Sequence, residues 1–285
     1  MPETRPEIVN QVSRSGFDVV EKPLRTWEKF YNTAGARRVL LLGLLAGVWE
    51  IYARWLNNPL LFPTFSDTIK ALFASLASGE IPHAAVYSIG MLLRGYAIGL
   101  ALAGLLTALA SAGRIGSDFL ETLTAMFNPL PSIALLPLAL IWFGLGNGSI
   151  IFVLIHAVLW AVALNMHAGF RAVSPTLRMV GMNYGLSKAG YVVRILLPAA
   201  FPNILTGLKI GWAFAWRTLI AAELVFGVSS GSGGIGWYIF EQKNQLLIPN
   251  VFAGLLTVIL FGLAVENLIF RTIERVTVRR WGMQS

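Results

Sequence analysis

Runs of about 20 apolar residues recur along the 285-residue chain, and they constrain its fold more than any other feature. As an α-helix, each run is long enough to cross a bilayer's hydrocarbon core of about 30 Å. A membrane β-barrel would instead show alternating segments of about 10 residues, and the sequence has none. Charged residues make up 13% of the chain, against about 25% in soluble domains. The sequence therefore predicts an all-α polytopic membrane protein.

We predict six transmembrane helices, and the third is unusual. The spans cover residues 39–56, 88–110, 120–143, 150–170, 200–226 and 251–273. Pro129, Pro131 and Pro137 lie in the third span, and each proline removes a backbone donor and disfavours the helix before it. Broken backbone at membrane depth must be buried in protein or line a cavity. We therefore expect this span to pack inside a bundle.

Positive charge is distributed unevenly between the two sets of loops. Residues 1–38, 111–119, 171–199 and the tail after 270 carry 16 Lys and Arg, and the opposite loops carry two. The positive-inside rule then places both termini in the cytoplasm. The net charge of +8 reflects this topology, because the basic residues lie at helix ends and do not form the clustered face that nucleic-acid binding needs.

We divide the chain into four parts. They are an N-terminal cytoplasmic arm (1–37), the first transmembrane helix with a periplasmic connection (38–87), a core of five helices (88–274) and a cytoplasmic tail (275–285). Apolar residues recur at helical spacing near the end of the arm, which predicts a helix lying on the inner leaflet. The alternative is a disordered arm. The arm lacks the apolar region of a cleaved signal peptide.

Several kinds of chemistry are missing from the sequence. The chain has no cysteine, which excludes disulfides and thiolate sites, and its three histidines are too far apart for metal-ligand spacing. No G-x-x-x-x-G-K-[ST] loop is present to hold ATP phosphates. Gly227–Gly231 matches G-x-S-x-G, but no Asp or His follows it as a hydrolase requires. Gly231–Gly236 matches G-x-G-x-x-G, but it follows a membrane span and is read as a flexible outer loop. We predict a chain that is not an enzyme and binds neither metal nor cofactor.

The polar segment 174–198, between the fourth and fifth spans, carries signals for two short helices. Ser174-Pro175 offers a capping hydroxyl followed by proline at the first helical position. Asn183-Tyr184-Gly185 interrupts that helix, because Asn or Gly can adopt the left-handed cap. Ser187 can cap a second helix, which Pro198 is expected to end. The alternative reading is an ordinary linker between two spans.

The same segment carries a family pattern. From Gly185 to Pro198 the chain reads Gly, nine residues, Ile, one residue, Leu-Pro. This resembles the EAA loop of ABC-importer permeases, although Met179-Val180-Gly181 replaces the E-A-A start and supplies no carboxylate. The stretches NPLPSIALLPLALIWFGLGNGS, LLPAAFPNILTGLKIGWAFAWRTLIAAELVFG and SGGIGWYIF look like permeases of the nitrate/sulfonate/taurine importer family.

The resemblance implies the type I importer fold and a transport function. The chain would be the permease subunit of an ATP-binding-cassette importer in the bacterial inner membrane, carrying a small anion or organic anion such as nitrate, a sulfonate or taurine. Its implied partners are a second permease subunit, expected as a homodimer, a periplasmic binding protein and two cytoplasmic ATPases that bind ATP and Mg²⁺. The alternative is a stand-alone secondary transporter or channel without an ATPase, against which the spans show no obvious inverted repeat.

The resemblance also assigns roles to individual residues. Contact with the ATPase is implied for the loop residues Met179, Gly181, Met182, Asn183, Tyr184, Gly185, Leu186, Ser187, Lys188 and Pro198. Ionisable residues inside spans are costly and are functional candidates. Our candidates for the translocation pathway are Arg94, Trp212, Trp216, Arg217 and Glu223. The guanidinium of Arg217 would present a fixed fork of donors to a small oxyanion.

Each pathway candidate has a structural alternative. Arg217 would instead pair with Glu223 or another carboxylate, although a spacing of six places these two residues on different faces of a straight helix. Helix packing is the alternative for both tryptophans, and pairing or snorkelling is the alternative for Arg94. Lys209 and Glu266 are expected to form a structural pair near the cytoplasmic end of the fifth and sixth spans.

Overall fold

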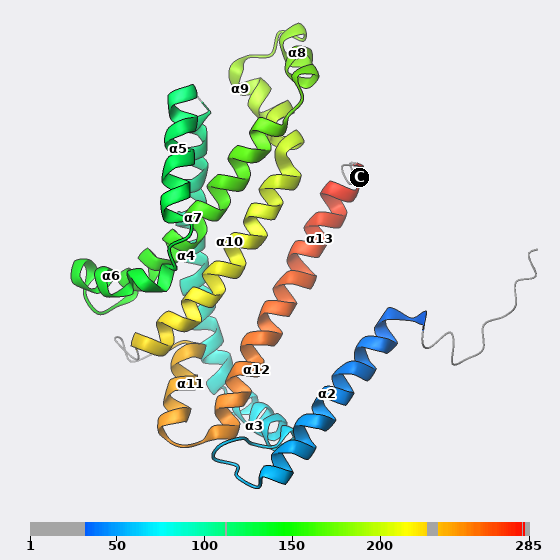
Figure 1. The fold of residues 1–285 in the computed structure, drawn as a ribbon, viewed down its shortest axis with the longest axis vertical. Helices are drawn as coiled ribbons and strands as arrows, with labels where there is room; N and C mark the ends of the chain where they lie inside the picture. Colours follow the sequence, from blue (N-terminus) through cyan, green and yellow to red (C-terminus); the bar gives the residue numbers. More distant parts are fainter. Residues whose placement is uncertain (1–31, 112, 227–232, 281, 283–285) are drawn as a thin grey trace, which may run out of the picture. The chain divides into compact units, whose positions relative to one another are not determined.

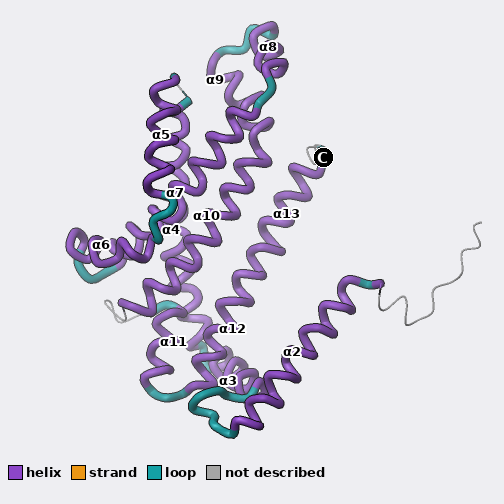
Figure 2. The backbone as a smooth tube through the Cα atoms, in the orientation of Figure 1, coloured by secondary structure: helices purple, strands orange, loops and turns teal. Residues whose placement is uncertain are grey.

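The structure is a computed structural model and describes residues 32–111, 113–226, 233–280 and 282. All regular secondary structure in these ranges is helical (Figure 2). The chain divides into two units, residues 1–51 and 52–285. The predicted interfacial helix of the N-terminal arm lies outside the described residues, as do the first two residues of the predicted outer loop Gly231–Gly236. The reading of a flexible loop is wrong for its last two residues, Ile235 and Gly236, because they are buried and begin a helix.

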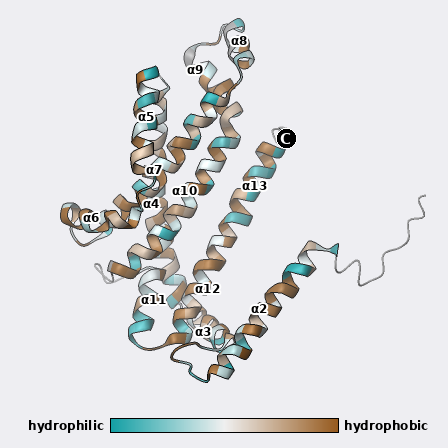
Figure 3. Ribbon diagram, in the orientation of Figure 1, coloured by the Kyte–Doolittle hydropathy of each residue, from teal (hydrophilic) through white to brown (hydrophobic). Residues whose placement is uncertain are grey.

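Five helices of the described part are long and apolar enough to span a membrane, and a bent helix pair makes a possible sixth span. The five are α2 (Ala34–Leu56), α4 (Glu80–Ala110), α7 (Asn147–Ala172), a span from Val192 to Val225 that covers all but the last residue of α10 (Leu197–Phe226), and a span from Ile248 to Arg279. The last span comprises α12 (Ile248–Ala264), η3 (Val265–Phe270), α13 (Arg271–Glu274) and η4 (Arg275–Arg279). Apolar residues dominate α12 (Figure 3). The predicted spans are therefore found, most of them longer than expected.

The core of the second unit is formed by α4, α7 and α10, which pack along one another (Figure 1). Glycines allow the close approach of α4 to α7. A Cβ added to Gly95 would lie 2.6 Å from the Cβ of Leu154, and one added to Gly99 would lie 2.8 Å from the Cβ of Val158. Small residues at helix crossings let backbones approach and gain van der Waals contact, which drives helix association in lipid.

The third span is broken, as its prolines predict. It comprises α5 (Arg114–Phe127), η1 (Ser132–Leu135) and α6 (Leu136–Phe143), and its two halves meet at 86°. Pro129 and Pro131 lie at the break, where a missing donor and a restricted preceding residue end the helix. Leu136 and Ala139 of α6 are buried, but Ile141 is 79% exposed in the single chain. Leu120 and Thr124 of α5 are also buried. The expectation that this span packs inside a bundle is thus met on one face of each half, while other side chains remain exposed in the single chain.

The end of the second unit opposite the segment 174–198 contains two further helices, α3 (Phe65–Ala77) and α11 (Ile235–Asn244) (Figure 1). Both pack against α12. The Tyr238 hydroxyl lies 2.8 Å from the Ser75 hydroxyl and joins α11 to α3. Burial raises the pKa of Tyr238. The helix turns the Tyr238 ring into the protein, where it is 4% exposed.

Candidate functional site

The polar segment 174–198 begins with α8 (Pro175–Asn183) and a sharp glycine corner at one end of the bundle (Figure 1). The Leu177 amide donates to the Ser174 hydroxyl at 3.4 Å, which confirms the predicted helix start. Gly185 has φ +64°, and the Leu186 amide donates to the Gly181 carbonyl at 3.2 Å. This six-residue bond around a left-handed glycine is the Schellman motif that closes a helix.

A second helix follows the corner, and it does not end where the sequence predicted. The Gly190 amide donates to the Ser187 hydroxyl at 3.1 Å, so Ser187 caps α9 (Lys188–Tyr191) as expected. The helix then continues through η2 (Val192–Leu196) into α10, so the prediction that Pro198 ends it is wrong. In η2 the helix has π geometry, with the Leu197 amide bonded to the Val192 carbonyl. α10 begins at Leu197, and the next residue is Pro198. Because proline has no amide hydrogen, no donor is left unpaired where π geometry changes back to α geometry.

We call residues 174–198 the coupling segment, after the ATPase contact that the resemblance implies for them. Its surface is apolar where the acidic start of the family pattern is missing. Met179 is 52% exposed and Tyr184 is 80% exposed. Gly181 is buried, and a Cβ there would lie 2.7 Å from the Tyr191 ring. Glycine at this position therefore lets α8 pack on the second helix. The side chains of Met182 and Lys188 lie outside the described part.

A second feature is a cavity of about 360 Å³ between α7, α10 and the broken segment 128–133. We call it the membrane cavity. Its polar lining residues are Asn128, Ser132, His156, Trp160, Arg217 and Thr218. None of the described residues that line it is acidic. The proline break thus places irregular backbone beside a cavity, as the constraint on membrane proteins requires.

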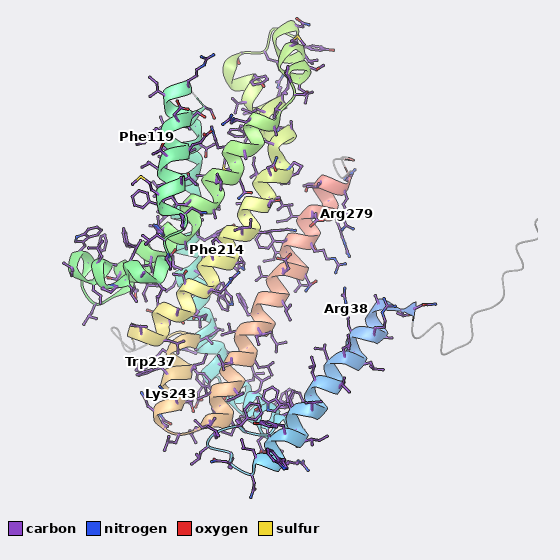
Figure 4. The ribbon with its side chains drawn as sticks, viewed as in Figure 1. Arg38, Phe119, Phe214, Trp237, Lys243 and Arg279 are labelled. Atoms are coloured by element: carbon purple, nitrogen blue, oxygen red, sulfur yellow. The ribbon has the colours of Figure 1, made fainter. Side chains whose placement is uncertain are left out.

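Arg217 is the one Lys or Arg among the described residues that line the membrane cavity. Its Nε donates to the Ala213 carbonyl at 3.1 Å within α10, and its guanidinium carbon lies 5.6 Å from the centroid of the Phe214 ring (Phe214 is labelled in Figure 4). No ion pair involves Arg217 among residues 32–111, 113–226 and 233–280. The guanidinium is therefore positioned by its own helix and not by a carboxylate.

Two residues of α7, His156 and Trp160, belong to the polar lining of the membrane cavity. The Ser132 hydroxyl lies 3.1 Å from His156 Nδ1. His156 Nε2 and Trp160 Nε1 are buried and have no hydrogen-bond partner within the described part of the chain. The Trp160 ring stacks on Phe127 at 5.2 Å. Our sequence analysis missed both residues, although their spacing of four places them on one face of α7.

Glu223 lies elsewhere and forms a buried link between three helices. Its carboxylate accepts the Ser88 hydroxyl at 2.7 Å and the Gly236 amide at 2.9 Å. The Ser88 oxygen in turn accepts the Ile235 amide at 2.9 Å. A Cβ on Gly236 would lie 2.6 Å from the Glu223 Cβ, and one on Gly234 would collide with the carboxylate. This Ser88–Glu223 cluster fixes the start of α11 to α4 and α10.

The other pathway candidates do not line the membrane cavity. Trp216 is 6% exposed, and its indole nitrogen donates to the Val258 carbonyl of α12 at 3.3 Å. Trp212 packs edge-on against Tyr96 of α4 at 5.4 Å. Arg94 is exposed on α4. Of the five candidates, the structure brings only Arg217 to the cavity.

Lys209 pairs with two carboxylates of the last span. Its Nζ lies 2.7 Å from Glu274 and 3.9 Å from Glu266. The predicted pair with Glu266 is therefore present at longer range, and Glu274 is the closer partner. Both contacts tie α10 to the last span near the end that carries the coupling segment.

Comparison with known proteins extends over most of the second unit. Residues 99–282 match the family described as binding-protein-dependent transport system inner membrane component. The putative aliphatic sulfonates transport permease protein of Escherichia coli is 32% identical over 243 residues, which cover 84% of this chain and 89% of that protein. A putative ABC transporter permease protein of Methanocaldococcus jannaschii is 28% identical over 234 residues, covering 81% and 86%. The nitrate import permease protein of a Synechocystis species is 34% identical over 152 residues, covering 53% and 54%.

Proposed function

Because the chain belongs to the family of binding-protein-dependent transport system inner membrane components, we propose that it forms the translocation pathway of an ATP-driven importer for a small inorganic or organic anion. The predicted family and the predicted all-α permease fold are confirmed. The anionic substrate is supported by the names of relatives, which are transport permeases for aliphatic sulfonates, taurine and nitrate. It is also supported by the lining of the membrane cavity, since none of its described residues is acidic.

The proposed assembly has two copies of this permease, two cytoplasmic ATPases and a periplasmic binding protein. The ATPases would bind ATP and Mg²⁺, and the coupling segment would dock onto them. Both chain termini would lie in the cytoplasm, as the excess of Lys and Arg in those loops favours. With no carboxylate at Met179-Val180-Gly181, docking would depend on the exposed apolar side chains around the glycine corner.

The observation that carries this proposal is the continuity of the helix from the coupling segment to the membrane cavity. The chain is helical without interruption from Lys188 to Phe226, and Arg217 lies on that helix. A displacement of the corner at Gly185 by an ATPase would therefore reach the cavity wall along one element. In the proposed cycle, ATP binding closes the ATPase pair and switches the cavity from inward-open to outward-open, where the binding protein releases its anion.

Reconstitution tests the assembly. We expect the chain to co-purify with a cognate ATPase and, in proteoliposomes, to support ATP hydrolysis that rises when loaded binding protein is added. Failure to form a complex, together with uptake that continues without ATP, would overturn the proposal and favour a stand-alone secondary transporter or channel.

Substitution of Arg217 tests the pathway. In Arg217→Ala, uptake should fall by more than tenfold, since the cavity loses its one guanidinium. Arg217→Lys should retain part of the uptake, because it keeps the charge but loses the planar fork. Initial uptake rates in proteoliposomes provide the measurement. Lys70→Ala removes a charge from an exposed pair with Asp67 on α3 and serves as the control. Near-normal uptake in both Arg217 variants would refute the pathway role.

A further inference from the structure

We infer that the last turns of the final span bind the headgroup of an anionic phospholipid at a row of exposed arginines. This arginine row consists of Arg271, Arg275, Arg279 and Arg280, on α13, on η4 and directly after it. Its ligand is a component of the bilayer and not a transported substrate. The inference therefore goes beyond the proposed function, and it is measurable without ATP.

The first argument is the depth at which the arginine row lies. The final span has 32 residues, which corresponds to as much as about 48 Å of helix at 1.5 Å per residue. The hydrocarbon core is about 30 Å thick, so the helix extends beyond it. Leu268 is 71% exposed, and Arg271, its neighbour three residues later, is exposed as well. The surface thus changes from apolar to basic within one turn, as expected at the level of the lipid headgroups.

The second argument is positive charge without a partner. Apart from Arg279, no member of the arginine row forms an ion pair within residues 32–111, 113–226 and 233–280. The nearby carboxylates are engaged elsewhere. Glu274 pairs with Lys209 at 2.7 Å and with Arg279 at 3.4 Å, and Glu266 lies 3.9 Å from the same lysine. Guanidinium groups match phosphate oxygens in pairs, and four or more basic residues directly after a span are typical of anionic-lipid binding.

The third argument is that the arginine row is held on a packed helix. Val278, within the row, is 4% exposed and clusters with Leu205 of α10. The ion pair of Lys209 with Glu274 attaches the same turns to α10 a second time. The backbone that carries the arginines is therefore already ordered, which lowers the entropy cost of binding.

The surroundings of the arginine row favour lipid over a docked ATPase. Within the second unit the final span ends short of α8, which extends further at this end (Figure 1). An ATPase docked on the coupling segment would contact α8 and the glycine corner. The arginines instead adjoin exposed apolar side chains, those of Leu268, Ile269 and Val276. Acyl chains that cover this apolar surface would bring the phosphate of the same molecule to the guanidinium groups.

Lipid binding to the full chain tests the inference. The chain is purified in a nonionic detergent, without ATPase or binding protein, and is titrated with dioleoylphosphatidylglycerol or with dioleoylphosphatidylcholine. Native mass spectrometry counts the lipid molecules bound at each concentration. The first phosphatidylglycerol molecule should bind at least tenfold more tightly than the first phosphatidylcholine molecule. Glycerophosphoglycerol, the same headgroup without acyl chains, should not compete at equal concentration.

Paired substitutions locate the site. Arg271→Gln combined with Arg275→Gln should weaken phosphatidylglycerol binding at least tenfold, because each basic residue near an anionic surface contributes about fivefold. Phosphatidylcholine binding should not change. Arg38→Gln combined with Arg114→Gln is the matched control, since it removes the same charge from exposed positions outside the arginine row, and it should change binding less than twofold.

A lysine pair separates loss of the site from loss of the fold. Arg271→Lys combined with Arg275→Lys keeps the positive charge that orients the span but loses both planar forks, and it should weaken phosphatidylglycerol binding about threefold. Circular dichroism and thermal unfolding report on the fold of each variant. If the glutamine pair does not fold, the lysine pair decides, and binding equal to that of the unmodified chain would overturn the inference.

Three other results would also overturn the inference: equal affinity for the two lipids, equal losses in the two glutamine pairs, or full competition by glycerophosphoglycerol. All of them are independent of ATP-driven transport. A chain that binds phosphatidylglycerol through the arginine row would do so even if no ATPase complex formed, and an active importer without lipid preference would refute this inference alone.

Discussion

Gly185→Pro is expected to reduce transport to less than a tenth while ATP hydrolysis by the assembled complex continues. Gly185 has φ +64°, and proline is locked near −65°, so the corner between α8 and α9 cannot keep its shape. The spans do not depend on this corner and should still insert. Uptake and hydrolysis are measured together in proteoliposomes, so that their ratio reports coupling directly.

Gly185→Asn is the matched control, since asparagine occupies the left-handed helix cap more readily than other non-glycine residues. It should retain most of the transport and a nearly normal ratio of uptake to hydrolysis. If Gly185→Pro had the same ratio of uptake to hydrolysis as the unmodified complex, the proposal that the corner transmits the displacement of the ATPase to the membrane cavity would be refuted.

Glu223→Ala is expected to release the start of α11 from the bundle. The substitution removes the acceptor for the Ser88 hydroxyl and for the Gly236 amide, both buried. Each buried donor left without an acceptor costs about 1–3 kcal/mol, so local opening of α11 should become much more frequent. Hydrogen–deuterium exchange of peptides covering Ile235–Asn244 measures this opening, and exchange there should accelerate at least tenfold.

Two control variants accompany Glu223→Ala in the exchange experiment. Glu223→Gln keeps the shape and one acceptor oxygen, so exchange should rise less than in the alanine variant. Glu241→Ala removes an exposed carboxylate from α11 itself and should leave exchange near that of the unmodified chain. Unchanged exchange across α11 in Glu223→Ala would show that the Ser88–Glu223 cluster does not hold this helix.

Local sequence signals predicted much of this molecule correctly. The spans follow from hydropathy, the break in the third span follows from its prolines, and the caps at Ser174 and Ser187 follow from local hydrogen-bond chemistry. The prediction that Pro198 ends the second helix was wrong. The free-energy cost of a proline in a helix depends on whether the amide hydrogen that it lacks would have had a hydrogen-bond partner. A π segment before it removes that cost, and sequence spacing does not reveal a π segment.

The candidate site was less predictable because it depends on contacts between distant segments. A charged residue in a span identifies Arg217 from sequence alone, but whether it faces a cavity or a carboxylate depends on how α7 and the segment 128–133 pack around it. His156 and Trp160 are ordinary residues of an apolar helix until the break brings Ser132 and Phe127 beside them. Trp212 and Trp216 show the reverse case, since their shared face packs against other helices.

The Ser88–Glu223 cluster also bears on the order in which the chain is assembled. Ser88 enters the bilayer on α4, and its acceptor follows 135 residues later. The free energy of placing a neutral hydroxyl without a partner in lipid is small, whereas that of an ionised carboxylate inside the membrane is large. Because synthesis starts at the N-terminus, Ser88 enters the membrane before Glu223. The Glu223 carboxylate therefore enters when the Ser88 hydroxyl is already present as a hydrogen-bond donor. A chain truncated before residue 223 would insert its first spans but would lack both Glu223 and α11, the two partners of the Ser88 hydroxyl.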